Sequence, residues 1–153
     1  MIFVNLLLLS GRYIWYMLLS KTFGYALRGI LYIAEKNGSG TKTNLDEIAR
    51  NLKIPRHFLA KVMKRLVKEG ILTSTKGPYG GFSINKRTLT TSLLQLAEFT
   101  GENASPDTCV LNLGNCSAQK PCVLHERAEK NKNSWHGVLK TTTVADLLSY
   151  PKK

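Results

Sequence analysis

The stretch from Asn44 to Ile84 constrains the fold more than any other, because its hydrophobic period changes sharply at one glycine. Between Pro55 and Gly70, apolar residues recur at intervals of three and four, as they do in a helix with one buried face. These apolar positions are Leu59, Val62, Met63, Leu66 and Val67. Pro55 suits the first helical position, and Gly70 suits the left-handed residue just past the end. This segment is therefore predicted to form one amphipathic helix.

A shorter helix is predicted directly before it, over residues 45–52. Asn44 can cap this helix, and Glu47, three residues on, can complete a capping box. Two short helices joined by a brief turn are typical of a helix-turn-helix, in which the second helix contacts DNA. After Gly70 the period changes to two, which predicts strands at 71–75 and 81–84 around a glycine-rich turn. A hairpin in this place is the wing of a winged helix.

The charge distribution favours a nucleic-acid partner. Residues 41–90 contain 11 Lys or Arg and 3 Asp or Glu, a net +8 of the chain's formal +12. Such concentration is expected where phosphates are neutralised, although a merely solvated basic face is the alternative. The glycine-rich basic wing favours double-stranded DNA. The predicted DNA contacts are Arg56, His57, Phe58, Lys61, Lys64 and Arg65 in the helix, and Lys76, Gly77, Pro78 and Tyr79 in the wing.

Further helices are predicted on both sides of this module. Residues 22–36 form a helix candidate whose apolar face comprises Phe23, Leu27, Ile30, Leu31 and Ala34. Ser92 begins a capping-box pattern that opens a short helix through Phe99, with Gly101 beyond its end. After an aperiodic loop, Cys122 to about Lys140 is predicted to be a long helix with a thin apolar seam, which predicts a partner helix. Residues 143–148 form a final helical turn.

The predicted fold class is mainly α with a small β-hairpin. Its parts are a winged helix-turn-helix at 17–100, a cysteine-containing loop at 101–122, and a long helix with a terminal turn at 123–148. Residues 1–16 form an apolar extension that fits a signal peptide poorly. Translation is expected to start at Met17, with a membrane anchor or an extra packed element as alternatives; Arg12 would make a membrane span costly.

Three cysteines and a histidine form the second informative pattern, Cys109-x6-Cys116-x5-Cys122-x2-His125. Clustered, odd-numbered cysteines in a lysine-rich chain favour a reducing compartment, the cytoplasm, and a metal or redox role. Thiolates suit an iron–sulfur cluster or zinc, but the tight cysteine pairs of zinc fingers are missing from the sequence. Spacing alone leaves a cluster, structural zinc, a redox thiol pair and unligated cysteines open. The sequence contains no acid–base or nucleophile constellation outside this loop, so an enzyme is not expected. An iron–sulfur electron-transfer protein is the alternative of another class.

Several motifs together resemble the Rrf-type winged-helix transcription regulators, a bacterial family, over Met17 to Leu148. They are Phe23-Gly24-Tyr25-Ala26-Leu27-Arg28, Leu45-x2-Ile48-Ala49, Ile54-x3-Phe58-Leu59, Leu66-x3-Gly70-Ile71-Leu72, Lys76-Gly77-Pro78-Tyr79-Gly80-Gly81-Phe82, Ser92-Leu93-Leu94 and Thr142-x-Val144-Ala145-Asp146-Leu147. The resemblance implies a homodimer formed through the long C-terminal helix, with both winged helices on a near-palindromic operator.

The resemblance also implies an iron–sulfur cluster held by Cys109, Cys116 and Cys122. Family members that use a histidine as fourth ligand carry it where His125 stands, whereas others use an acidic residue at the position of Gly24. Glycine cannot ligate, so the resemblance implies a 2Fe–2S centre with three cysteines and His125. The first spacing is x6 where x5 is commoner, and Lys76 stands where arginine is usual.

Overall fold

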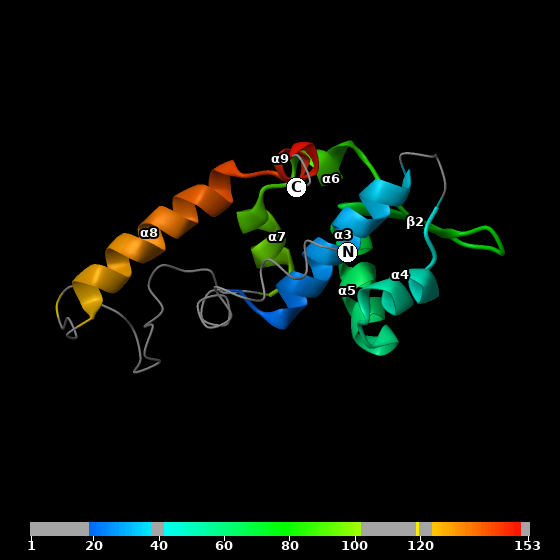
Figure 1. The fold of residues 1–153 in the computed structure, drawn as a ribbon, viewed down its shortest axis with the longest axis horizontal. Helices are drawn as coiled ribbons and strands as arrows, with labels where there is room; N and C mark the ends of the chain where they lie inside the picture. The colour runs from blue at the N-terminus through cyan, green and yellow to red at the C-terminus, as the bar shows by residue number, and fades with distance from the viewer. Residues whose placement is uncertain (1–18, 38–41, 102–118, 120–123, 151–153) are drawn as a thin grey trace.

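The computed structural model describes residues 19–37, 42–101, 119 and 124–150 (Figure 1). The expectations for residues 1–16 and for the three cysteines lie outside these ranges. The elements are α3 (Lys21–Asn37), α4 (Leu45–Leu52), α5 (Arg56–Lys68), β1 (Leu72–Thr75), β2 (Gly81–Ile84), α6 (Lys86–Thr90), α7 (Leu93–Phe99), α8 (His125–Thr141) and α9 (Val144–Ser149). In these ranges no helix has both the length and the apolar character needed to cross a bilayer. The predicted class, mainly α with a small hairpin, is confirmed.

The core lies around α3, which contacts α4, α5, α7, α9 and β2. Figure 1 shows the hairpin extending at one end of the molecule and α8 projecting at the other. The predicted apolar face of α3 was partly wrong. Phe23 and Ile30 are buried as expected, but Ala26 and Ile33 complete the buried stripe, whereas Leu27, Leu31 and Ala34 are only partly buried. Which face of α3 is buried depends on the elements that pack on several sides of it. The periodicity of α3 alone cannot predict where those elements lie.

The predicted end signals of the helices are mostly confirmed. Asn44 caps α4 by accepting from the Glu47 N–H at 2.8 Å, and Ser92 forms a full capping box with Gln95. Gly70 has a φ of +71° just past the end of α5. Pro55 was placed one residue too far into its helix, because its ψ of 125° is extended and makes it the N-cap. Helix α6 was not predicted.

The hairpin pairs Leu72 with Ile84 at its base and Thr75 with Gly81 at its tip. A third segment joins it, because Thr43 exchanges both backbone hydrogen bonds with Phe82, at 3.0 and 2.8 Å. Thr43 is almost completely buried and directly precedes the cap of α4. The wing is therefore attached to the first helix of the helix-turn-helix as well as to the second.

The C-terminal end of α8 is fixed to the domain by backbone hydrogen bonds. Leu93 N–H donates to the Thr142 carbonyl at 2.9 Å, and Val144 N–H donates to the Thr91 carbonyl at 3.0 Å. Val144 is completely buried. These contacts explain why α8 departs from the domain at a defined place, between α7 and α9 (Figure 1).

Candidate nucleic-acid interface

Helix α5 has one buried face and one basic face. Leu59, Val62, Met63 and Leu66 are buried as predicted, and Val67 is partly buried. At 3.6 residues per turn, the side of the helix opposite this stripe is polar and basic. It consists of His57, Lys61, Lys64 and Lys68, all of them exposed. The structure thus places four polar or cationic side chains where a duplex can approach them.

The turn before α5 is short and fixed. Lys53 adopts a left-handed conformation with a φ of +52°, and its neighbour Ile54 is buried. The Ile54 N–H donates to the Ala49 carbonyl at 3.0 Å. Because the turn is anchored in the core, the first residues of α5 are held in a defined position relative to α4.

Arg56 and Arg65 differ from the lysines of α5, because each lies against another part of the protein. Arg56 donates from Nε to the Asp46 carboxylate of α4. At the other end of α5, the Arg65 guanidinium lies beside Gly101, so that a Cβ added there would be 3.3 Å from Nη1. Both were predicted DNA contacts; both are exposed, and both have a protein neighbour that the sequence did not reveal.

Phe58 is an exposed aromatic ring in the first turn of α5. Its side chain is half exposed, and its ring centroid lies 4.4 Å from that of His57. An exposed apolar ring can contact a thymine methyl group or a sugar. Phe58 and His57 therefore form an exposed aromatic pair in the first turn of α5.

The wing presents its predicted residues to solvent. Lys76, Gly77, Pro78 and Tyr79 are all exposed, and Tyr79 is 94% exposed at the tip. The turn needs a glycine at Gly77, whose φ is +113°. The ammonium of Lys76 has no protein partner among the described residues. The wing thus carries a cation and an aromatic ring away from the domain.

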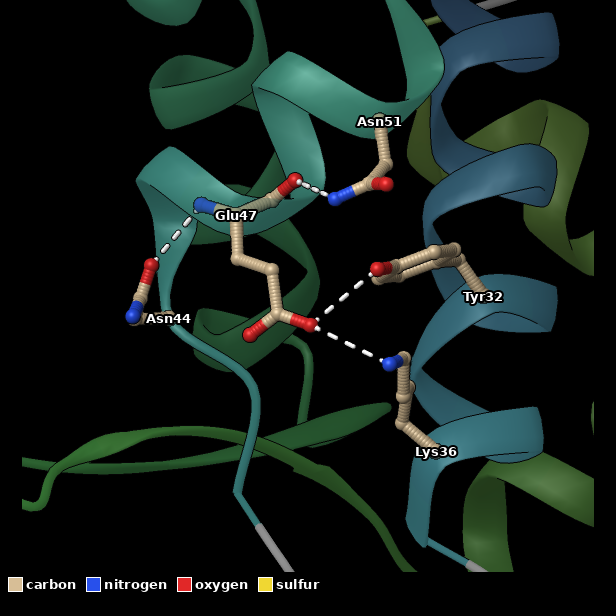
Figure 2. A network of polar contacts seen from close by, with 5 residues as sticks. All are labelled: Tyr32, Lys36, Asn44, Glu47 and Asn51. Atoms are coloured by element: carbon tan, nitrogen blue, oxygen red, sulfur yellow. Dashed lines mark hydrogen bonds and ion pairs between the residues drawn. The ribbon is translucent and has the colours of Figure 1, made fainter.

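Glu47 fixes α4 against α3 through a polar network that the sequence did not reveal (Figure 2). Its carboxylate accepts from the Tyr32 hydroxyl at 3.1 Å and pairs with the Lys36 ammonium at 3.6 Å. The capping box predicted for Glu47 was therefore only half right: its N–H is capped, while its side chain turns to α3. Burial, followed by the hydrogen bond to Glu47, raises the pKa of Tyr32 above its ordinary value.

Of the four predicted cluster ligands, only His125 lies in the described part of the chain. It is the first residue of α8, and its Nε2 lies 3.5 Å from the Glu129 carboxylate one turn later. Cys109, Cys116 and Cys122 fall outside the described ranges. Within those ranges, no three His, Cys, Asp or Glu side chains gather closely enough to hold a metal ion.

Helix α8 carries an apolar seam, as predicted. The structure describes all of its residues, and none is buried. Trp135 and Val138 are 43% and 47% exposed, and Leu124, just before the helix, is 40% exposed. Helical geometry places these three on one side. Large apolar side chains left exposed along one line of a projecting helix are typical of a surface that binds another protein.

The chain matches the model of the Rrf2 family, iron-dependent transcriptional regulators, over residues 19–150. The chain belongs to this family. A relative from Aquifex aeolicus, assigned to the helix-turn-helix transcriptional regulators, is 37% identical over 90% of this chain and 95% of its own length. The regulator NsrR of Geobacillus kaustophilus is 31% identical, over 81% and 84% of the two chains.

Solved structures give the same fold. The global cysteine regulator CymR of B. subtilis superposes with a TM-score of 0.69 at 21% identity, covering 88% of this chain and 98% of that one. IscR of T. potens superposes with a TM-score of 0.63 at 19% identity, covering 88% and 93%. The Rrf2 assignment confirms the resemblance inferred from the motifs, and it agrees with the expectation of a regulator and not an enzyme.

Sequence reasoning missed two features of this Rrf2 chain that bear on the site. Asp46 was treated only as part of a short helix, although it contacts the first residue of α5. Thr43 was not assigned to the wing, although it forms the bridge to Phe82. The acidic residue in the first turn of α4 was a signal from which the contact of Asp46 could have been predicted. Thr43 offered no such signal, because a single-residue bridge produces no periodic pattern in the sequence.

Proposed function

We propose that this Rrf2 protein binds double-stranded DNA with the start of α5 in the major groove and the wing on the flanking backbone. The observation that carries the proposal is the exposed basic face of α5, opposite a buried stripe that fixes its orientation. Lys61 and Lys64 point away from the core with no protein partner among the described residues. As a regulator that binds DNA, the protein acts in the cytoplasm.

Two lysine variants test the assignment of base and phosphate contacts. The probe is a duplex selected by the wild-type protein from a randomised pool, compared with a scrambled duplex of the same composition. Lys61→Ala should weaken binding to the selected duplex by about 1–3 kcal/mol more than to the scrambled one. Lys76→Ala should weaken both equally and reduce the salt dependence by about one charge. Lys130→Ala, on the exposed surface of α8, is the control. Undiminished binding by both test variants would reject this face.

The second part of the proposal is a homodimer formed through α8. The seam of Leu124, Trp135 and Val138 supports it, because these side chains are exposed in the single chain. Trp135→Glu should turn the dimer into a monomer in sedimentation equilibrium and abolish binding to a two-half-site duplex. Asn133→Glu adds the same charge on the side of α8 opposite the seam and should leave the dimer intact. Equal dissociation of both variants, or of neither, contradicts the seam as the interface.

The third part is a 2Fe–2S cluster held by Cys109, Cys116, Cys122 and His125. The donor set fits: three thiolates and an imidazole suit a small iron–sulfur centre. His125 stands at the start of α8 with its Nε2 3.5 Å from the Glu129 carboxylate, and carboxylates are common neighbours of metal-binding histidines. The family description as iron-dependent regulators also supports iron. When bound, the cluster supplies a centre that responds to iron supply or oxidation. The three cysteines and His125 would hold it.

The competing proposal is a cluster-free regulator that uses its cysteines as thiols or binds zinc. The similarity to a global cysteine regulator favours this candidate. Anaerobic purification followed by iron, sulfide and zinc determination separates the two, with absorption spectroscopy as a second measurement. Equal iron and sulfide with a visible chromophore, lost in Cys122→Ser, supports the cluster. A colourless protein, with or without zinc, supports the alternative.

A further inference from the structure

The ion pair between Asp46 and Arg56 joins the two helices of the helix-turn-helix on their solvent side. Asp46 lies in the first turn of α4, and Arg56 is the first residue of α5. The Arg56 Nε donates to Asp46 Oδ1. Both side chains are mostly exposed, at 64% for Arg56 and 58% for Asp46.

This pair contributes little to the packing of α4 on α5. Exposed ion pairs add little stability, because water screens them and both side chains lose freedom. The two helices are already joined by the buried side chains of Ile48, Ile54 and Leu59. The pair therefore acts on Arg56 itself and not on the fold.

The contact leaves most of the guanidinium available. A guanidinium has five N–H donors in one plane, and only Nε–H is used here. The four Nη donors have no partner among the described residues. A fixed Nε edge restricts the plane of the group and directs the Nη edge, which is the edge that pairs with guanine O6 and N7 or with a phosphate.

We propose that Asp46 is a positioning residue that sets the DNA specificity of Arg56. The proposal rests on the proposed DNA-binding role of α5. Asp46 orients the guanidinium before DNA arrives, so the base contact costs less conformational entropy. Its negative charge also opposes a non-specific approach of phosphate to the same place. Together these effects raise the preference of the protein for its own sequence over other DNA.

The test measures the affinity ratio between the selected and the scrambled duplex at several salt concentrations. Asp46→Asn keeps the size of the side chain and removes its charge. We expect the affinity ratio to fall about tenfold, because Arg56 loses its fixed direction. The salt slope on scrambled DNA should steepen by about 0.9, the increment for one additional phosphate contact. Asp46→Glu should restore most of the ratio. Glu98→Gln makes the same charge change on exposed α7 and should alter neither quantity.

The double variant shows whether Asp46 acts through Arg56. In Arg56→Ala protein, Asp46→Asn should no longer change the affinity ratio. An unchanged ratio in the single variant overturns the proposal, as does an equal change in the Arg56→Ala background, because charge alone then explains it. An Asp46→Asn protein that is markedly less stable in thermal unfolding also overturns it, by making the pair structural. A different result would refute the proposed function itself: wild-type protein that shows neither salt-dependent binding to DNA nor a preference for any duplex.

Discussion

Gly81 is the residue on which the attachment of the wing depends. Its φ is +154°, a conformation that costs a non-glycine residue about 1–3 kcal/mol. A Cβ at this position would also lie 2.6 Å from the carbonyl oxygen of Thr43. That carbonyl accepts one of the two hydrogen bonds between Thr43 and Phe82. Relieving the contact weakens both bonds, each worth about 0.5–1.5 kcal/mol. Gly81→Ala should therefore destabilise the protein by about 3 kcal/mol.

Gly77→Ala provides the matched control. Gly77 also has a positive φ, of +113°, but a Cβ there meets nothing within 4 Å. Gly77→Ala should therefore lower the free energy of unfolding only through the strain of the positive φ, by about 1 kcal/mol. Urea unfolding followed by circular dichroism gives both free energies, and thermal unfolding should show a shift of about 2–4 °C per kcal/mol. If Gly81→Ala is no less stable than Gly77→Ala, the close approach of Thr43 does not determine the wing's position.

Three smaller changes test other contacts. Tyr32→Phe should remove an alkaline loss of stability: the pKa of Tyr32 is raised in the folded state, so its contribution is present below pH 10 and lost as the pH rises through the folded value. Urea midpoints of both proteins across that range check this. Asp146→Asn should reduce the loss of unfolding free energy at acid pH. Backbone and side-chain hydrogen bonds from Thr143 lower the pKa of Asp146 in the folded protein, so the stability that its carboxylate contributes is lost as the pH falls below 3.8 toward the folded value. The same urea midpoints, measured at acid pH, check this. Gly24→Ala, in α3 with open space around it, should raise stability in thermal unfolding by about 0.5–1 kcal/mol.

The fold could be predicted where one segment carries its own signal. The helix α5, the hairpin and the caps at Asn44 and Ser92 depend on residues within a few positions of one another. Local hydrogen bonds and local period decide them, so the sequence contains the answer. Helix α6 is the exception: its five residues are too few for a period, and its Asn85 cap with Thr88 at the third position is not the usual capping-box pair.

Contacts between segments could not be predicted in the same way. The buried face of α3 is set by five neighbouring elements, so Ala26 and Ile33 are buried in preference to Leu27 and Leu31. Glu47 has two partners within reach, its own helix end and Tyr32, and the packing of α3 on α4 selects the second. The exposed residues of α5 were predictable as a set, because amphipathicity alone defines them. Their individual partners were not.

The partners divide the cations of α5 into two groups with different physical roles. The Asp46 carboxylate holds Arg56, so the planar group of Arg56 is oriented by the protein before any ligand binds, and the Arg65 guanidinium lies beside Gly101. Lys61 and Lys64 extend from the exposed face with no partner among the described residues. A flexible ammonium neutralises a phosphate wherever it finds one, whereas an oriented guanidinium favours one geometry of acceptors. Salt dependence should therefore follow the lysines that meet phosphates, such as Lys76. Sequence preference should depend on the arginine that Asp46 holds, together with the base contact proposed for Lys61. Exchanging Lys61 for arginine should not replace Arg56, because position 61 lies about 1.4 turns further along α5 and on a different side of the helix from the residue that meets the Asp46 carboxylate.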